Sequence, residues 1–287
     1  MANPQKITPF LWFDNQAEEA AAFYSSVFRK STIDKVQRMG GAVKVVDFSL
    51  DGLRFSAMDA GPMFQLNPSI SFYAVCETEA ETDAIWGQLV DGGIILMPLE
   101  KYPWSDKYGW VQDRFGVSWQ IGLGKLEHTG GQRFSPFLMF SGAQSGKAEE
   151  ALHFYSSVFK PSAIEGILRY GPGEEGKEGT VNHAQFTLCG QTFMVVDSNI
   201  DHPFGFNEAL SFMIDCEDQK EVDYYWDSLL SGGGQESMCG WLKDRFGVSW
   251  QVVPRILIEL VTHPDPERAK RASAAMMQMR KIEIDKL

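Results

Sequence analysis

Along the chain, the spacing of hydrophobic residues switches between the alternation typical of a strand and the three-to-four-residue spacing typical of a helix. Residues 17–28 place apolar side chains on one helical stripe, whereas residues on either side of Asp51-Gly52 alternate as in two strands joined by a two-residue turn. The pattern predicts strands over 7–13, 31–39, 43–50, 53–59, 69–75, 108–113 and 116–123, with helices over 17–28 and 79–90. This order is a βαβββ unit followed by nearly the same unit again.

The chain also repeats itself at long range. The octapeptide DRFGVSWQ occurs at residues 113–120 and again at 244–251, and the pair EEAAAFYSSVF and EEALHFYSSVF has the same separation, 131 residues. A shared register over distant segments indicates a tandem duplication. We expect one domain over residues 1–126, a second over 132–261 and a helical tail over 262–287.

Charge and composition narrow the classes of partner. The net charge of −12 would repel phosphate, so no nucleic-acid partner is expected. The chain has no apolar run of eighteen residues, and its N-terminus lacks the pattern of a signal peptide, so we expect no membrane contact and a cytoplasmic location. Its four cysteines form no CxxC pair and are expected to be reduced.

Several motifs resemble those of one superfamily. The segments FLWFDNQAEEAAAFYSSVF, GPMFQLNPSISF, GWVQDRFGVSWQ and GWLKDRFGVSWQVV are similar to the vicinal oxygen chelate superfamily, which includes glyoxalase I, bleomycin resistance protein and extradiol dioxygenases. Within it they most resemble the PhnB-like group, often labelled demethylubiquinone methyltransferase-like. The resemblance implies an α+β fold: a tandem duplication of a vicinal-oxygen-chelate domain, with four βαβββ units whose curled mixed sheets form cups.

The resemblance also implies where a metal ion would bind. In metal-using members a glutamate stands seven residues after the Asp of the last turn, and that position is Gln120 in the first copy and Gln251 in the second. The remaining ligand positions fall on Thr8 and Ser135, near Phe55 and Phe193, and within Ser69–Ser71 and Ala209–Ser211. These residues provide no imidazole or carboxylate, so we expect no metal and no cofactor.

Side-chain alternation predicts the lining of each cup. If Gln120 faces the cup then Ser118 does too, while Trp119 faces the helices and belongs to the core, as Trp250 does. We expect eight ligand-binding residues: Thr8, Trp12, Ser118, Gln120, Ser135, Met139, Ser249 and Gln251. A purely structural role for the two glutamines stays an equal alternative.

Other polar residues have simpler explanations. Asp59, Asp197, Asn67 and Asn207 lie at strand ends, where turns are more common than ligand contacts. His183 lies within a strand and is a candidate general base. The chain contains no nucleophile motif, and no glycine-rich turn joins a strand to a helix, so a Rossmann-type methyl-donor site is not expected.

These observations favour a metal-independent protein that binds a small apolar or aromatic molecule, with or without transforming it; whether it is an enzyme stays open. One alternative is a metal-dependent lyase or dioxygenase of the same superfamily, and another is a non-catalytic sequestering protein. A homodimer is compatible with the sequence. Each domain could close alone or the two could exchange units, and we expect the tail to dock on the second domain, with a lid or a dimer contact as alternatives.

Overall fold

The computed structural model describes residues 5–39 and 42–287, so the first four residues of the N-terminal stretch lie outside it. The chain divides into two compact units. One contains the beginning of the chain, up to Phe10, together with Phe206–Leu287, and the other is Leu11–Gly205. Among the described residues, no helix has the length and apolar character needed to cross a membrane.

The elements follow the predicted alternation, with some additions. The strands are β1 (Ile7–Phe13), β2 (Ser31–Met39), β3 (Ala42–Leu50), β4 (Leu53–Asp59), β5 (Ile70–Cys76), β6 (Ile94–Tyr102), β7 (Ser105–Gln112), β8 (Ser118–Leu123), β9 (Phe134–Phe140), β10 (Ser162–Arg169), β11 (Val181–Leu188), β12 (Gln191–Asp197), β13 (Leu210–Cys216), β14 (Gln235–Glu236), β15 (Trp241–Lys243) and β16 (Ser249–Pro254). The α-helices are α1 (Ala17–Val27), α2 (Glu79–Leu89), α3 (Ala148–Val158), α4 (Gln219–Leu230), α5 (Arg255–Val261) and α6 (Pro266–Met276), and short 3-10 turns are η1 (Leu126–Thr129), η2 (Gly142–Gln144) and η3 (Ile284–Lys286).

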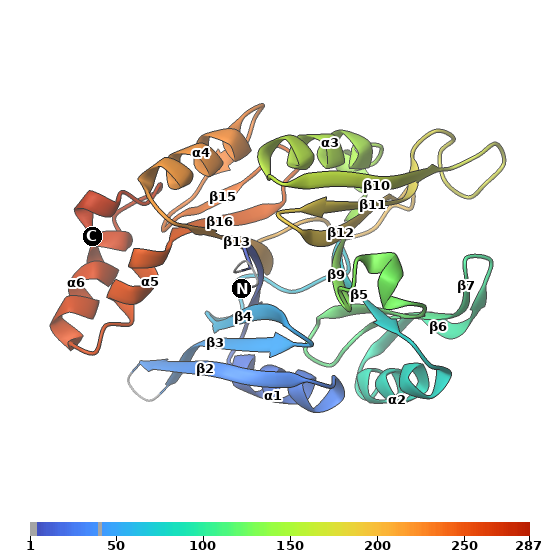
Figure 1. Ribbon diagram of the computed structural model, residues 1–287, viewed down its shortest axis with the longest axis horizontal. Helices are drawn as coiled ribbons and strands as arrows, with labels where there is room; N and C mark the ends of the chain where they lie inside the picture. The colour runs from blue at the N-terminus through green and yellow to red at the C-terminus, as the bar shows by residue number, and fades with distance from the viewer. Residues whose placement is uncertain (1–4, 40–41) are drawn as a thin grey trace. The chain divides into compact units, whose positions relative to one another are not determined.

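The strands form two eight-stranded mixed sheets, which confirms the α+β class. Sheet A has the order β14-β15-β16-β13-β1-β4-β3-β2, and sheet B has the order β10-β11-β12-β9-β5-β8-β7-β6. Both sheets are open, with β14 and β2 at the edges of sheet A and β10 and β6 at the edges of sheet B. Sheet B lies within the unit Leu11–Gly205 and curls from β10 round to β6 and β7 (Figure 1).

Sheet B combines strands from both copies of the sequence repeat. At its centre β9, from the second copy, pairs antiparallel with β5, from the first, and Tyr73 lies opposite Ser135. On their outer sides β5 pairs parallel with β8 and β9 pairs parallel with β12. The two copies have therefore exchanged units in this sheet, which is one of the two arrangements that the sequence left open. The boundaries of the sequence repeats stay a prediction.

The repeated octapeptide forms the same buried loop twice. Asp113 accepts hydrogen bonds at Oδ1 from the backbone N–H groups of Phe115 and Val117, at 2.8 and 3.1 Å, and at Oδ2 from Trp119 Nε1 at 2.8 Å. Burial raises the pKa of Asp113 to about 6, against the lowering effect of these donors. Asp244 accepts the corresponding three bonds, with its Oδ2 bound to Trp250 Nε1 at 2.8 Å. The carboxylate thus organises the loop that leads into each last strand.

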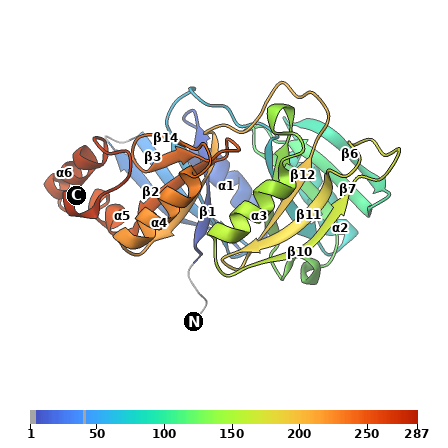
Figure 2. The ribbon, with the colours of Figure 1, turned by 90° about the horizontal axis from the view of Figure 1, so that it is seen from above.

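The face of sheet B opposite Gln120 packs against the core and the helices. Trp119 on this face and its counterpart Trp250 in sheet A are each 1% exposed, which confirms that they are core residues. Helix α2 approaches the sheet so closely that a Cβ at Gly109 would lie 2.6 Å from the ring of Trp86. Helix α3 lies along β10, β11 and β12 (Figure 2).

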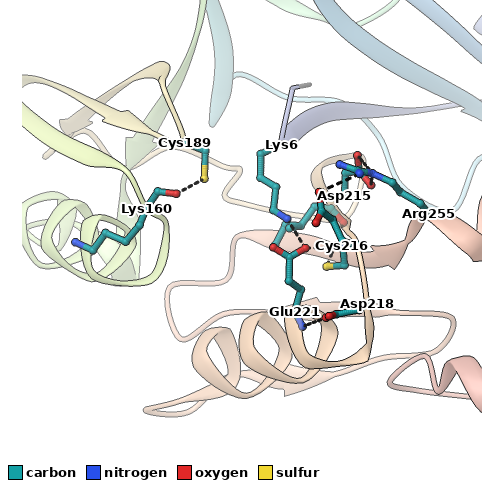
Figure 3. A network of polar contacts seen from close by, with 10 residues as sticks. Lys6, Lys160, Cys189, Asp215, Cys216, Asp218, Glu221 and Arg255 are labelled. Carbon is teal, nitrogen blue, oxygen red and sulfur yellow. Dashed lines mark hydrogen bonds and ion pairs between the residues drawn. The ribbon is translucent and has the colours of Figure 1, made fainter. Parts of the chain in front are cut away.

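Ion pairs join the exchanged elements. Arg133 precedes β9 and binds Asp51 at 2.6 Å and Glu81 at 3.2 Å, and all three side chains are about 15% exposed. In the other unit the equivalent residue is Lys6, whose Nζ lies 2.7 Å from Glu221 on α4 (Figure 3). Breaking a largely buried pair leaves an uncompensated charge, so the contacts of Arg133 favour the observed pairing of units.

Several elements were not predicted, among them strand β6 and helix α5. Strand β6 carries Pro98 and three register irregularities against β7, so it lacks the simple alternation from which strands are predicted. Helix α5 follows β16 directly and was not expected either. The expected tail helix is confirmed: α6 begins at Pro266, and Asp265 accepts from the backbone N–H of Glu267 at 3.0 Å.

Candidate functional site

The face of sheet B that carries Gln120 is the best-defined candidate site. The register places Gln120 beside Tyr73 of β5 and opposite Trp110 of β7, and Tyr73 in turn lies opposite Ser135 of β9. Met194 of β12 pairs with Phe137, so its side chain lies on the same side as Ser135. We call this surface the Gln120 face.

The amide of Gln120 is held at both ends. Its Nε2 donates to Ser71 Oγ at 2.8 Å, and its Oε1 accepts from the phenol of Tyr108 at 2.7 Å. The side chain is 6% exposed. Gln120 therefore helps to join β5, β7 and β8, and one of its two amide hydrogens remains for another acceptor.

Three other predicted residues lie on the same face. Ser118 Oγ accepts from Trp110 Nε1 at 2.8 Å. Ser135 is fully buried, and its Oγ has no hydrogen-bond partner among the residues that the structure describes. Met139 is 6% exposed and lies two residues beyond Phe137. An unpaired buried hydroxyl costs free energy, so Ser135 is the position where a polar ligand atom would contribute most.

Aromatic residues of β5 and of the β6–β7 hairpin border this face. The ring of Tyr73 covers Gly122, where a Cβ would lie only 2.5 Å from the phenol oxygen. Tyr102 and Trp104 stack with centroids 5.0 Å apart, and each ring contacts Tyr108 edge-on. Burial raises the pKa of both Tyr73 and Tyr108, so both phenols are neutral donors near pH 7.

His183 of β11 also faces this side of sheet B. Its ring centroid lies 5.7 Å from that of Phe137. Burial lowers the pKa of His183, so the imidazole is neutral at pH 7. In the described part of the chain no carboxylate lies within ion-pair distance of His183, so the structure supplies no partner that would activate it as a general base.

The second copy places Gln251 in the other unit, with fewer contacts. Gln251 Nε2 donates to Ser211 Oγ at 2.9 Å, as Gln120 does to Ser71. The side chain opposite Gln251 is Trp241, whose ring contacts Phe10, so Thr8 lies on this face too. Ser249 Oγ is buried, and no partner for it is found among the described residues. Trp12 belongs to the unit Leu11–Gly205, where its Nε1 donates to the carbonyl of Gly61 at 2.7 Å.

We call the side of sheet A that carries Gln251, Met213 and Trp241 the Gln251 side. The chain after β16 packs against this side of its own unit, so the expected docking of the tail is confirmed. Met279 and Ile282 form a cluster with Val253 of β16, and Met213 of β13 packs against it. The backbone N–H groups of Cys239 and Gly240 donate to the carbonyls of Met279 and Arg280, both at 2.7 Å. We call residues 279–287 the C-terminal strap. A hollow of about 530 Å³ lies beside it, and several of the charged groups that line it form ion pairs, such as Arg280 with Glu236.

The residues at the expected metal positions do not fit a divalent cation. On the Gln120 face these positions correspond to Ser71, Gln120, Ser135 and Met194, because Phe193 points to the opposite side and its neighbour Met194 takes its place. None of the four carries a charge, and the described residues contain no group of three or more His, Cys, Asp or Glu side chains able to hold a metal ion.

The acidic and amide residues at strand ends serve the backbone. Asp59 accepts from the N–H of Ala17 at the start of α1, at 2.9 Å, and Asp197 accepts from that of Ala148 at the start of α3, at 3.1 Å. Asn67 binds the N–H two residues further on, the geometry of a turn. The contact of Asn67 confirms the expected turn, whereas Asp59 and Asp197 each bind the start of a helix distant in sequence, a role that was not predicted.

Sequence reasoning missed the contribution of β7. Tyr108 and Trp110 donate to Gln120 and Ser118, yet neither was predicted as a site residue. The alternation in YGWVQD places both on one side of the strand, and a hairpin partner of the Gln120 strand must present that side to the same face. This pattern was the available sequence signal.

A comparison with protein families gives a match over both copies. The family described as 3-demethylubiquinone-9 3-methyltransferase matches residues 5–122 and 132–253. No curated protein matches the chain.

Some solved structures match less than half of the chain, and others match most of it. A putative 3-demethylubiquinone-9 3-methyltransferase, PhnB protein, from Bacillus cereus is 43% identical over 42% of this chain and 100% of its own, with a TM-score of 0.41. A protein from Pseudomonas aeruginosa is 22% identical over 42% of this chain and 97% of its own, with a TM-score of 0.37. Glyoxalase I from Zea mays covers 85% of this chain and 92% of its own at 9% identity, with a TM-score of 0.54, a likeness of fold alone.

Proposed function

Because the chain belongs to the 3-demethylubiquinone-9 3-methyltransferase family, a PhnB-like group with the glyoxalase fold, we propose that it binds a small apolar or aromatic molecule on the Gln120 face without a resident metal ion. The proposal assigns ligand contacts to Gln120, Ser118, Ser135 and Met139. The location proposed for the protein is the cytoplasm.

One observation carries the proposal: buried polar groups with unused hydrogen-bonding capacity lie among aromatic and apolar side chains. Ser135 Oγ has no partner among described residues, and the Gln120 amide uses one of its two hydrogens. Tyr73, Phe137 and Met194 surround these groups with apolar surface. Sites for small molecules typically combine such a lining with a few fixed polar atoms.

The test is the affinity of a hydrophobic fluorescent ketone, 6-propionyl-2-(dimethylamino)naphthalene, for matched variants; its carbonyl oxygen can accept from the free N–H of Gln120 and from Ser135. Gln120→Leu and Ser135→Ala are expected to weaken binding by about fivefold each, the loss of one neutral hydrogen bond. Gln88→Leu, at an exposed position on α2, is the control and is expected to leave the affinity unchanged. Equal affinities for wild type, Gln120→Leu and Ser135→Ala would contradict the proposal.

A second measurement addresses the alternatives. Native mass spectrometry of the purified chain is expected to show a co-purified small molecule and no metal. Stoichiometric Zn, Ni, Mn or Fe by elemental analysis would favour a metal-dependent lyase or dioxygenase instead. Recovery of a bound molecule unchanged after long incubation would indicate sequestration without turnover.

A further inference from the structure

The two glutamines differ in one contact that decides what the amide offers to a ligand. Gln120 Oε1 accepts the phenol proton of Tyr108 at 2.7 Å, while its Nε2 donates to Ser71. In the second copy the position of Tyr108 is taken by Cys239, in the segment CGWLKD that corresponds to YGWVQD. Gln251 keeps the bond to Ser211.

The chemistry of the two hydroxyl groups fixes the direction of the Gln120 amide. A phenol is a stronger donor and a weaker acceptor than an alcohol, because its oxygen lone pair is delocalised into the ring. The amide oxygen therefore turns towards Tyr108 and the amide nitrogen towards Ser71. Packing holds the phenol in place, since Tyr108 is 8% exposed and contacts the rings of Tyr102 and Trp104.

We propose that Tyr108 is a positioning residue that makes the Gln120 face select ligands with an acceptor oxygen, such as an aryl ketone, over ligands of the same shape without one. The proposal rests on the proposed function. With its oxygen engaged by Tyr108 and one hydrogen engaged by Ser71, Gln120 presents its second N–H to the ligand. Without the phenol, the Gln120 amide can rotate so that its oxygen and nitrogen exchange places. The preference of the Gln120 face for ligands with an acceptor oxygen is then reduced.

Two probes of nearly equal shape test the proposal: acetophenone, with a carbonyl oxygen, and α-methylstyrene, with a methylene group in its place. Titration calorimetry is expected to show that the wild-type chain binds acetophenone about fivefold more tightly, the contribution of one neutral hydrogen bond. Tyr108→Phe keeps the ring and removes the donor. In this variant the ratio is expected to fall towards one, with the affinity for α-methylstyrene unchanged.

Tyr102→Phe is the matched control, because the phenol of Tyr102 donates to the carbonyl of Pro98 at 3.0 Å and not to Gln120. It is expected to keep the fivefold ratio. An unchanged ratio in Tyr108→Phe would overturn the proposal. An equal loss of affinity for both probes in that variant would overturn it too, because it would show that Tyr108 acts only through packing.

A readout without ligand separates the two proposals. In the ¹⁵N-labelled chain, the side-chain amide protons of Gln120, assigned by their loss in Gln120→Leu, are expected to show nuclear Overhauser contacts to Ser71. In Tyr108→Phe these contacts are expected to weaken. If neither probe binds while this change is seen, the proposed function fails and the orienting role of Tyr108 remains; contacts that persist unchanged in Tyr108→Phe overturn that role.

Discussion

The Gln120 face and the Gln251 side of the molecule contain the same octapeptide in different surroundings. On the first, the strand next to the glutamine belongs to the long hairpin of β6 and β7, which brings the phenol of Tyr108 to the amide. On the second, the hairpin shrinks to β14 and β15, with two and three residues, and the C-terminal strap binds the backbone of Cys239 and Gly240. One copy provides its glutamine with the phenol of Tyr108, whereas the other has Cys239 at that position and binds the strap there.

Comparing the two copies shows which contacts belong to the repeated octapeptide and which come from the residues around it. Asp113 and Asp244 form the same three hydrogen bonds in their loops, so the motif is explained by folding. The side chains that distinguish the two glutamines come from the neighbouring strand, outside the motif. Residues that are identical in the two copies therefore maintain the shared fold. Residues that differ between the copies are the ones expected to make a site specific.

The largest effect on stability is expected from the aspartates of the repeated octapeptide. Asp113→Ala leaves two backbone N–H groups and the indole of Trp119 without their acceptor, which should lower the free energy of unfolding by about 3 kcal/mol. Asp244→Ala should have a similar effect for the same reason. Chemical denaturation measures both. A loss below about 1 kcal/mol in either variant would show that the loop does not depend on its carboxylate.

The next largest effect on stability is expected at the C-terminal strap, which packs against the second copy. Ile282 is fully buried in the cluster with Val253 and Leu257, so Ile282→Ala should cost about 2 kcal/mol. Hydrogen exchange at Gly240, whose N–H binds the strap, should become faster, and the Cys239 thiol should react more readily. Met277→Ala is the control, because Met277 is 63% exposed. Equal exchange rates in the two variants would show that Ile282 does not hold the strap.

The smallest effect concerns His183, which has Val45 as its counterpart in the first copy. Burial lowers the pKa of His183, so the folded state binds its proton less tightly than the unfolded state does. The stability that this residue contributes is therefore present above about pH 6.5 and is lost as the pH falls below that value. His183→Val should remove this part of the pH dependence of unfolding, whereas His128→Gln, at a side chain that is 70% exposed, should not. The same dependence in both variants would assign it to other groups.

Much of the fold could be predicted from the sequence, because the evidence is local and repeated. Alternation around Asp51-Gly52 predicts the β3–β4 hairpin, and the core position of Trp119 follows from the alternation beside Gln120. The exchange of units could not be predicted, because β1 and β9 are corresponding strands of similar sequence, and the pattern does not show which of them pairs with the free edge of β5.

The site was predicted in part. Alternation places Ser118 and Gln120 on one face with Ser135, but the partners of the amide depend on a strand whose pairing is not visible in the sequence. Tyr108 reaches Gln120 only because β7 and β8 pair in the observed register. Their function as ligand contacts stays a prediction until the affinities are measured.

The antiparallel pairing of β5 with β9 has a consequence for how the polypeptide can be cut. The seam between the copies, around Gly130-Gly131, connects strands that are already hydrogen-bonded into sheet B on both sides. A protease that nicks this seam would release no separate half, because the two fragments would remain interlocked along β5 and β9. Conversely, either half expressed alone would present an unpaired central strand, a surface prone to self-association, and co-expression of the halves would be the way to reconstitute the protein.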